Sequence, residues 1–185
     1  MGKLVVFQGP SGAGKSTLGK LCGLPLFTTY TSRTPRPGEV NGEDYYFVSK
    51  DQLCEMHTRG ELCEFIRYGD NYYGTTNFQL GTLINGDQDY YTILTAEGAE
   101  QYRDLLPSNI FVIGIFCSQL NAYTRLCTRY GSEYLKIVER IQGYDKEVLD
   151  LAACDTVIST DLPIEMSLQG VKAIIKLLGK ESVYK

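Results

Sequence analysis

The chain has 185 residues, a length for one domain with small insertions, and its 43% hydrophobic and 22% charged residues are ordinary for a globular protein. Its longest strongly apolar run, Ile110 to Cys117, is too short to span a bilayer. No signal peptide is expected, because Lys3 leads directly into a short strand-like run and then glycines. The net charge of −4 gives no general electrostatic reason to bind nucleic acid. We therefore expect neither a membrane nor a nucleic-acid partner.

The six cysteines are scattered along the chain without a CxxC pair. With a single histidine, His57, they do not form a zinc-binding pattern. They are predicted to be reduced thiols, several of them buried, in a cytoplasmic protein.

The first third of the chain predicts a strand, a glycine-rich loop and a helix, the order that opens many α/β domains. The strand is Leu4–Phe7 and the helix is Ser16–Cys22. A second strand is predicted over Leu26–Thr31, followed by a loop over Thr34–Glu43 that has too many prolines and glycines for a helix.

From residue 44 to residue 75 the pattern changes to short aromatic and β-branched runs separated by turns, which predicts a small, mainly β insertion. The runs are Tyr45–Val48, Leu62–Arg67 and Tyr72–Tyr73, with helices predicted around Gln52–Arg59 and over Asn77–Ile84.

The α/β alternation then returns, which predicts a parallel-sheet core with a small β insertion and a mobile helical segment. The expected strands are Tyr91–Leu94, Ile110–Cys117 and Thr156–Ser159. The expected helices are Glu97–Leu106, Gln119–Thr128, a longer charged helix over Ser132–Leu151, and one from Pro163 to Leu178.

The segment from Gly9 to Ser16 satisfies GxxxxGK[ST] between a predicted strand and a predicted helix. Its glycines let backbone N–H groups curl around phosphate oxygens. Lys15 supplies a cation for the β- and γ-phosphates, and Ser16 supplies a hydroxyl ligand for Mg²⁺. A glycine-rich turn without a ligand is the alternative, but the motif in this context favours a nucleoside triphosphate. The predicted ATP site is Gly9, Pro10, Ser11, Gly12, Ala13, Gly14, Lys15, Ser16 and Thr17.

A second anion site is indicated by Arg33 and Arg36, three residues apart on a proline-stiffened loop. Two guanidinium groups can fork onto one dianionic phosphate, and Tyr45 and Tyr73 can add hydroxyl donors. The residues alone leave an ordinary solvated basic loop as an open alternative.

These segments resemble guanylate kinases. The matching stretches are GPSGAGKST at 9–17, TSRTPRPGEVNGEDYYFVS at 31–49, and the segment from Glu64 to Thr75 that ends NYYGT. The resemblance implies a P-loop NTPase-type parallel sheet core flanked by helices, a small mixed β-sheet insertion that binds the acceptor, and a helical lid. In that single domain over 1–185, the core is about 1–31 and 88–185, the insertion about 32–87 and the lid about 125–145.

For the acceptor site, the resemblance implies that Glu64 accepts hydrogen bonds from guanine N1 and the exocyclic amine. A surface carboxylate on a strand is the alternative for this residue. Thr29 and Thr75 are expected as lesser base contacts, and Glu39 is expected to organise the site. The implied ligands of the GMP phosphate are Arg33, Arg36, Tyr45 and Tyr73.

For the lid, three arginines lie on or beside a predicted break at Tyr130–Gly131. Arg129 and Arg140 are 11 residues apart, about three turns if the chain between them is wholly helical. The resemblance implies that these two and Arg125 contact the ATP phosphates and the transition state, with Lys15 as the fourth catalytic residue. A merely solvated charged helix face is the alternative.

The resemblance weakens after the third core strand, where the chain reads Tyr91-Thr-Ile-Leu-Thr-Ala-Glu-Gly98. Thr95 stands where guanylate kinases usually carry an aspartate that recognises the base, and Glu97 is the nearby carboxylate. The predicted function is transfer of the γ-phosphoryl group from ATP, with Mg²⁺, to GMP, giving GDP and ADP. The alternatives are a kinase of another phosphorylated acceptor, such as a different nucleotide or a sugar phosphate, and a non-catalytic phosphopeptide-binding module.

Overall fold

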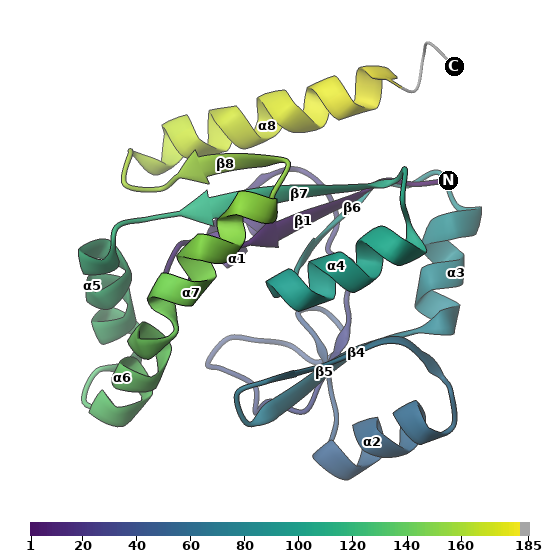
Figure 1. Cartoon of the computed structure of the whole chain (residues 1–185), viewed down its shortest axis with the longest axis horizontal. Helices are drawn as coiled ribbons and strands as arrows, with labels where there is room; N and C mark the ends of the chain where they lie inside the picture. Colours follow the sequence, from purple (N-terminus) through teal and green to yellow (C-terminus); the bar gives the residue numbers. More distant parts are fainter. Residues whose placement is uncertain (182–185) are drawn as a thin grey trace.

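A computed structural model describes residues 1–181, which form two four-stranded sheets and their covering helices (Figure 1). The larger sheet is wholly parallel, with the strand order β6–β1–β7–β8. Its strands are β1 Leu4–Gln8, β6 Tyr90–Ile93, β7 Ile110–Phe116 and β8 Thr156–Ser159.

Helices cover both faces of this sheet. Successive side chains of a strand point to opposite faces, so each strand contributes to two hydrophobic clusters. Val5 and Phe7 pack in one cluster with residues of α1 (Lys15–Leu21) and α8 (Ile164–Glu181). Leu4 and Val6 pack in the other cluster with α3 (Asn77–Asn85) and α4 (Ala96–Leu105). In Figure 1, α8 lies above the sheet and α4 below it.

The smaller sheet is mixed, with the strand order β3–β2–β5–β4. Its strands are β2 Tyr30–Thr31, β3 Tyr46–Phe47, β4 Leu62–Tyr68 and β5 Asn71–Thr76, and α2 (Lys50–Thr58) packs against β4 and β5. Strand β2 runs parallel to β3 and antiparallel to β5. Together with the parallel core, this confirms the predicted fold class.

The strand predicted over Leu26–Thr31 is wrong in extent, because the segment divides between the two sheets. Leu26 makes an isolated bridge to Tyr91, and the Phe27 N–H donates to the Tyr91 carbonyl at 2.7 Å. Only Tyr30 and Thr31 continue as a strand, in the smaller sheet. The segment therefore connects the core to the insertion.

The long helix predicted over Ser132–Leu151 is also wrong, since the chain there forms α6 (Tyr134–Gln142), α7 (Tyr144–Leu149) and a 3₁₀ turn, η1 (Asp150–Ala153). Gly143 separates the two helices, at a residue type with low helix propensity. The preceding helix, α5 (Gln119–Tyr130), ends at Gly131, whose φ is +55°. In Figure 1 these helices stand beside the smaller sheet. Within residues 1–181, no helix combines the length and apolar character that crossing a membrane requires.

Candidate functional site

The loop between β1 and α1 has a backbone that only glycine adopts readily at three positions. Gly9, Gly12 and Gly14 have φ values of +142°, +87° and +93°. A Cβ on Gly9 would lie 2.1 Å from the Ile115 carbonyl oxygen, and one on Gly12 would lie 2.8 Å from the Ala122 carbonyl oxygen. The sequence motif therefore forms a tight loop against the ends of β7 and α5.

Lys15 lies over this loop. Its Nζ donates to the carbonyl oxygens of Gly9 and Pro10 at 2.6 and 2.9 Å. Burial lowers the pKa of Lys15 to about 8, the negative charge of Glu147 opposes the shift, and the positive charges of Arg129 and Arg36 add to it. Charges from α5 and from the insertion thus act on the lysine of the phosphate loop, so Arg129 and Arg36 lie within electrostatic reach of Lys15.

Arg33 is the buried centre of the insertion's basic loop. Its guanidinium donates to Glu39 Oε1 at 2.9 Å and to the Thr34 carbonyl at 2.8 Å, and its Cζ lies 5.5 Å from the centre of the Tyr45 ring. The other oxygen of Glu39 accepts from the Arg36 N–H at 2.7 Å. Burial alone would raise the pKa of Glu39, but the two arginines outweigh it and hold the pKa below its usual value. An ionised Glu39 therefore fixes this loop.

Tyrosine rings surround this basic loop. Tyr45 packs edge-on against Tyr73, with 6.1 Å between ring centres, and Tyr73 packs in the same way against Tyr68, at 6.5 Å. Burial raises the pKa of Tyr45 to about 12, so its hydroxyl is a protonated donor at neutral pH. The structure thus brings together the two arginines and two tyrosines predicted to hold one phosphate.

Glu64 lies in the interior of β4 and is 3% exposed. Its Oε2 accepts a hydrogen bond from the Thr75 hydroxyl at 3.1 Å, and that hydroxyl accepts one from Tyr102 at 2.6 Å. Burial raises the pKa of Glu64 to about 7, the Thr75 hydrogen bond opposes the shift, and the charge of Glu97 adds to it. This is a buried carboxylate between the insertion and α4, not a surface group.

Two other residues considered for the base site have backbone roles. Thr95 is the N-cap of α4, and its hydroxyl accepts from the Gly98 N–H at 3.1 Å. Thr29 is buried just before β2, where its carbonyl accepts from the Tyr46 N–H at 2.9 Å. The hydroxyl that replaces the expected aspartate is therefore engaged by its own helix.

The three lid arginines have different surroundings. Arg125 donates to the Gly12 carbonyl at 3.1 Å and to the Thr160 carbonyl at 2.7 Å, so it braces the phosphate loop from α5. Around Tyr130, burial would raise the pKa of the phenol, but the positive charges of Arg36, Arg140 and Arg129 outweigh it and lower the pKa. Arg129 and Arg140 lie on different helices, because α5 ends at Gly131. Even so, the positive charges of both arginines lower the pKa of the same tyrosine, Tyr130.

Tyr68 and Glu147 connect the insertion, the phosphate loop and the helices α6 and α7. No sequence motif assigns a role to either residue. The Ser11 N–H donates to Glu147 Oε2 at 2.9 Å, the Tyr68 hydroxyl donates to Glu147 Oε1, and the Arg140 Cζ lies 5.4 Å from the centre of the Tyr68 ring. Strand alternation could have found Tyr68, since it shares a strand face with Glu64. Glu147 had no such signal, because charges on a helix are usually solvated.

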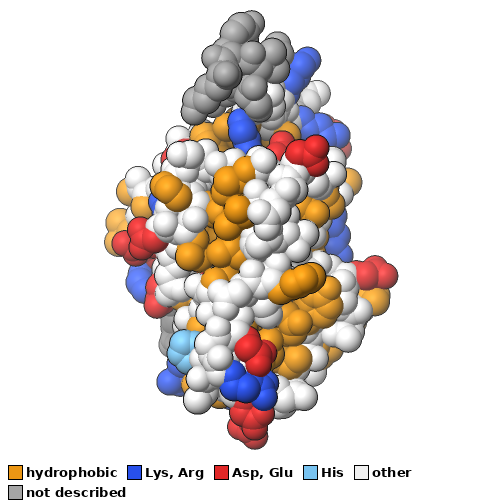
Figure 2. All heavy atoms as spheres, turned by 90° about the vertical axis from the view of Figure 1, so that its right-hand side faces the viewer, with side chains coloured by type: hydrophobic (Ala, Val, Ile, Leu, Met, Phe, Trp, Pro, Cys, Tyr) orange, Lys and Arg blue, Asp and Glu red, His pale blue; other side chains and the backbone are white. Residues whose placement is uncertain are grey.

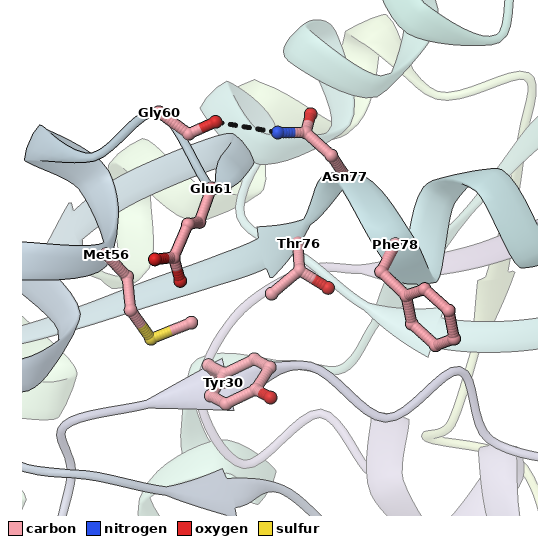
Figure 3. A pocket seen from close by; sticks show the side chains of 7 residues that line it. All are labelled: Tyr30, Met56, Gly60, Glu61, Thr76, Asn77 and Phe78. Atoms are coloured by element: carbon pink, nitrogen blue, oxygen red, sulfur yellow. Dashed lines mark hydrogen bonds between the residues drawn. The ribbon is translucent and has the colours of Figure 1, made fainter.

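A pocket of about 510 Å³ lies elsewhere, on the insertion (Figure 3). Its lining residues are Tyr30, Met56, Gly60, Glu61, Thr76, Asn77 and Phe78. Thr76 follows Thr75 along β5, so the pocket lies on the other face of the smaller sheet from Glu64. Its one charged lining residue is Glu61, which disfavours a phosphate. Figure 2 views the whole molecule from the right-hand side of Figure 1, and on this side hydrophobic side chains gather over the middle, with Lys and Arg side chains mainly toward the ends and edges.

Within residues 1–181, no group of three or more His, Cys, Asp or Glu side chains lies close enough together to hold a metal ion. Ser16 is exposed at the start of α1 and offers one hydroxyl. A divalent cation at this loop would therefore be held mainly by phosphate oxygens and water, the coordination that Mg²⁺ often keeps.

Known proteins resemble this chain over nearly its whole length. The family profile described as guanylate kinase matches residues 1–178. The guanylate kinase of Lactobacillus johnsonii is 31% identical over 182 residues, which cover 95% of this chain and 88% of that protein. The guanylate kinase of Bacillus subtilis is 32% identical over 181 residues, covering 94% and 88%. The crystal structure of guanylate kinase from Anaplasma phagocytophilum has the same fold, with a TM-score of 0.75, 22% identity, and coverage of 95% of this chain and 85% of that one.

Proposed function

The chain belongs to the guanylate kinase family, and we propose that it transfers the γ-phosphoryl group of ATP to GMP, giving GDP and ADP. The observation that carries this proposal is a glycine-built phosphate loop beneath Lys15, together with a cluster of two arginines and two tyrosines on the insertion. Lys15 on the phosphate loop feels the charges of Arg36 on the insertion and Arg129 on α5. Transfer between two phosphates requires two anion sites that lie close together, and the effect of Arg36 on Lys15 supports such an arrangement.

The ATP phosphates bind the amides of residues 9–17. Binding redirects Lys15, which leaves the Gly9 and Pro10 carbonyls and reaches the β- and γ-phosphates. Arg125 keeps the loop in shape through its contacts with Gly12 and Thr160. Burial disfavours the charged form of Lys15. A shift from carbonyl oxygens to negatively charged phosphate oxygens stabilises that charged form.

The GMP phosphate binds Arg33, Arg36, Tyr45 and Tyr73, and Glu39 holds Arg33 in place through their ion pair. Glu64 accepts from the base, with Thr75 behind it. As the acceptor phosphate is already anionic near neutral pH, no strong general base is needed. Positioning of the acceptor oxygen in line with the γ-phosphorus supplies the main part of the catalysis.

Residues 125–145 form the lid. Arg129 and Arg140 bring positive charge to the surroundings of Tyr130, and this charge stabilises the negative charge that the migrating phosphoryl group spreads over its oxygens. Closure of the lid excludes water from the reaction.

Ser16 fits the Mg²⁺ that accompanies ATP, and the ion would neutralise phosphate charge while keeping several water ligands. All six cysteines are free thiols, which supports the reducing cytoplasm as the location of the protein.

The second candidate is the same transfer to another phosphorylated acceptor. The Thr95 hydroxyl caps α4, so it is already engaged at the place where the expected aspartate would accept from a base N–H. A site with one acceptor fewer discriminates less against bases that lack that N–H.

The test is a turnover assay with purified protein, Mg·ATP and a panel of GMP, dGMP, AMP, CMP, UMP and sugar phosphates, read by ADP release. Turnover with GMP well above that with the other acceptors supports the proposal. Turnover only with another acceptor overturns it in favour of the second candidate. Absence of turnover together with measurable phosphopeptide binding overturns both and assigns a binding module.

A further inference from the structure

We propose that Tyr102 is a positioning residue of the acceptor pocket, which acts through Thr75 to keep Glu64 ready to accept hydrogen bonds from the acceptor base. The inference rests on the proposed function, in which Glu64 contacts that base. Tyr102 comes from α4, outside every sequence motif discussed above. It packs in the core cluster of Leu4 and Val6, whereas Ala13 of the phosphate loop packs in the other cluster.

Three buried groups form one chain of hydrogen bonds. The Tyr102 hydroxyl donates to Thr75 Oγ1 at 2.6 Å, and the Thr75 hydroxyl donates to Glu64 Oε2 at 3.1 Å. Tyr102 and Thr75 are fully buried and Glu64 is 3% exposed. Water therefore does not replace either hydroxyl easily, and each bond has a defined direction.

The direction follows from counting donors. A hydroxyl has one hydrogen to donate, so the Tyr102 donor is used on Thr75 and the Thr75 donor is used on Glu64. Thr75 then has no donor left for a ligand. The chain ends on the carboxylate, and Oε1, the oxygen next to Gly98, is the acceptor that remains. Hydrogen bonds that end on a carboxylate favour its ionised form.

Other charged and titratable groups face Glu64 from the elements packed around it. Glu97 on α4 adds negative charge and disfavours ionisation of Glu64. Burial raises the pKa of Cys63, the neighbour on β4, to about 11, and it holds the pKa of Tyr102 well above its usual value. Neither of these two groups changes charge between pH 6 and pH 9. Lys15, with its pKa of about 8, is the same in the wild type and in a Tyr102 variant, so a difference between their pH profiles in that range belongs to Glu64.

Removal of the Tyr102 hydroxyl leaves the ring in place but releases Thr75 from its fixed orientation. The Thr75 hydroxyl then donates to Glu64 for only part of the time. The pKa of Glu64 therefore rises, and a larger share of Glu64 is protonated near neutral pH. The protonated carboxyl accepts less well from a base N–H. Above the pKa of Glu64 the carboxylate is ionised with or without this help, so the loss shrinks as the pH rises.

The experiment compares the whole chain with Tyr102→Phe by measuring kcat/KM for GMP from pH 6 to pH 9, KM for ATP, and the melting temperature. We expect a fall in kcat/KM for GMP of about five-fold at pH 7, shrinking to less than about two-fold at pH 9, with KM for ATP unchanged. Tyr91→Phe is the matched control, because it removes a hydroxyl from another buried tyrosine in the core. That control should change neither parameter. A loss that is equal at every pH, or that appears equally in KM for ATP, overturns the inference in favour of simple packing.

A second pair of variants tests whether Tyr102 acts through Thr75. Thr75→Val removes the direct donor to Glu64 and should lower kcat/KM for GMP at pH 7 by more than Tyr102→Phe does. The double variant should then match Thr75→Val alone. Additive losses overturn the inference. Failure of the wild-type chain to use GMP overturns the proposed function instead, and that result is read before any variant is made.

Discussion

The backbone amide of Ser11 donates a hydrogen bond to the carboxylate of Glu147, with 2.9 Å between the nitrogen and Oε2. The other carboxylate oxygen accepts from the Tyr68 hydroxyl, and the same carboxylate raises the pKa of Lys15 against the effect of burial. A negative group therefore already sits on an amide of the phosphate loop before any nucleotide binds. ATP brings several negative charges to the same loop, so the two compete.

Glu147→Gln is expected to tighten ATP binding. The amide keeps the size of the side chain but removes the repulsion between a carboxylate and the incoming phosphates, and a three- to ten-fold lower Kd corresponds to roughly 1 kcal/mol. Calorimetric titration with Mg·ATP measures it. Asp145→Asn, an exposed position on the same helix, controls for a general change of charge and should leave the Kd unchanged. An unchanged or weaker affinity in Glu147→Gln would show that the carboxylate does not obstruct the loop.

Lys15→Ala is expected to lower kcat by at least about 100-fold. The variant loses the only charge on the phosphate loop itself, and removal of one well-placed donor to developing negative charge costs on that order. The assay is ADP release at saturating ATP and GMP. Lys172→Ala removes an exposed lysine of α8, which is not part of the phosphate loop, and should keep wild-type turnover. Residual turnover above one tenth of wild type in Lys15→Ala would contradict the role given to this residue.

The phosphate loop and the parallel core could be predicted because each depends on local sequence. Gly9 and Gly12 are dictated by positive φ and close backbone contacts, and the buried strands are continuous apolar runs. The path of residues 26–31 depends on where two sheets lie relative to each other. A strand-like pattern alone does not contain that information.

The connections between parts of the site were missed for the same reason. Glu147 contacts Ser11 across 136 residues of sequence, and Tyr102 contacts Thr75 across 27. Glu147 lies on α7, where a charged residue is ordinarily explained by contact with solvent. Tyr102 lies on α4, where a buried aromatic residue is ordinarily explained by core packing. Their partners are set by tertiary structure, which brings α7 to the phosphate loop and α4 to the insertion.

Gly131→Ala is expected to destabilise the junction of α5 and α6. Gly131 has φ +55° and ψ −115°, and nothing lies within 4 Å of an added Cβ, so the whole cost is backbone strain of about 1–3 kcal/mol. We expect a lower melting temperature and a reduced kcat, because the proposed lid, residues 125–145, contains this junction. Gly143→Ala is the control, since φ −83° and ψ −6° suit alanine and an added Cβ again meets nothing. Equal melting temperatures for the two variants would rule out strain at Gly131.

Glu64→Gln is expected to stabilise the free protein at alkaline pH while it weakens the use of GMP. Burial raises the pKa of Glu64 to about 7 from an ordinary 4.5, so the folded state holds this proton more tightly than the unfolded state does. The free energy of unfolding of the wild type therefore falls as the pH rises from about 4.5 to 7, by about 3 kcal/mol in all. Glutamine is neutral throughout and still accepts from Thr75, so it avoids this loss.

The difference in melting temperature between Glu64→Gln and the wild type should accordingly be small at pH 5 and reach roughly 5–10 °C at pH 8. Glu61→Gln, an exposed carboxylate just before β4, provides the control and should show no such trend. A difference that is constant with pH would mean that Glu64 does not titrate with a raised pKa. Its burial would then be compensated by contacts other than the Thr75 hydroxyl, and the acceptor pocket would hold an ionised carboxylate over the whole range.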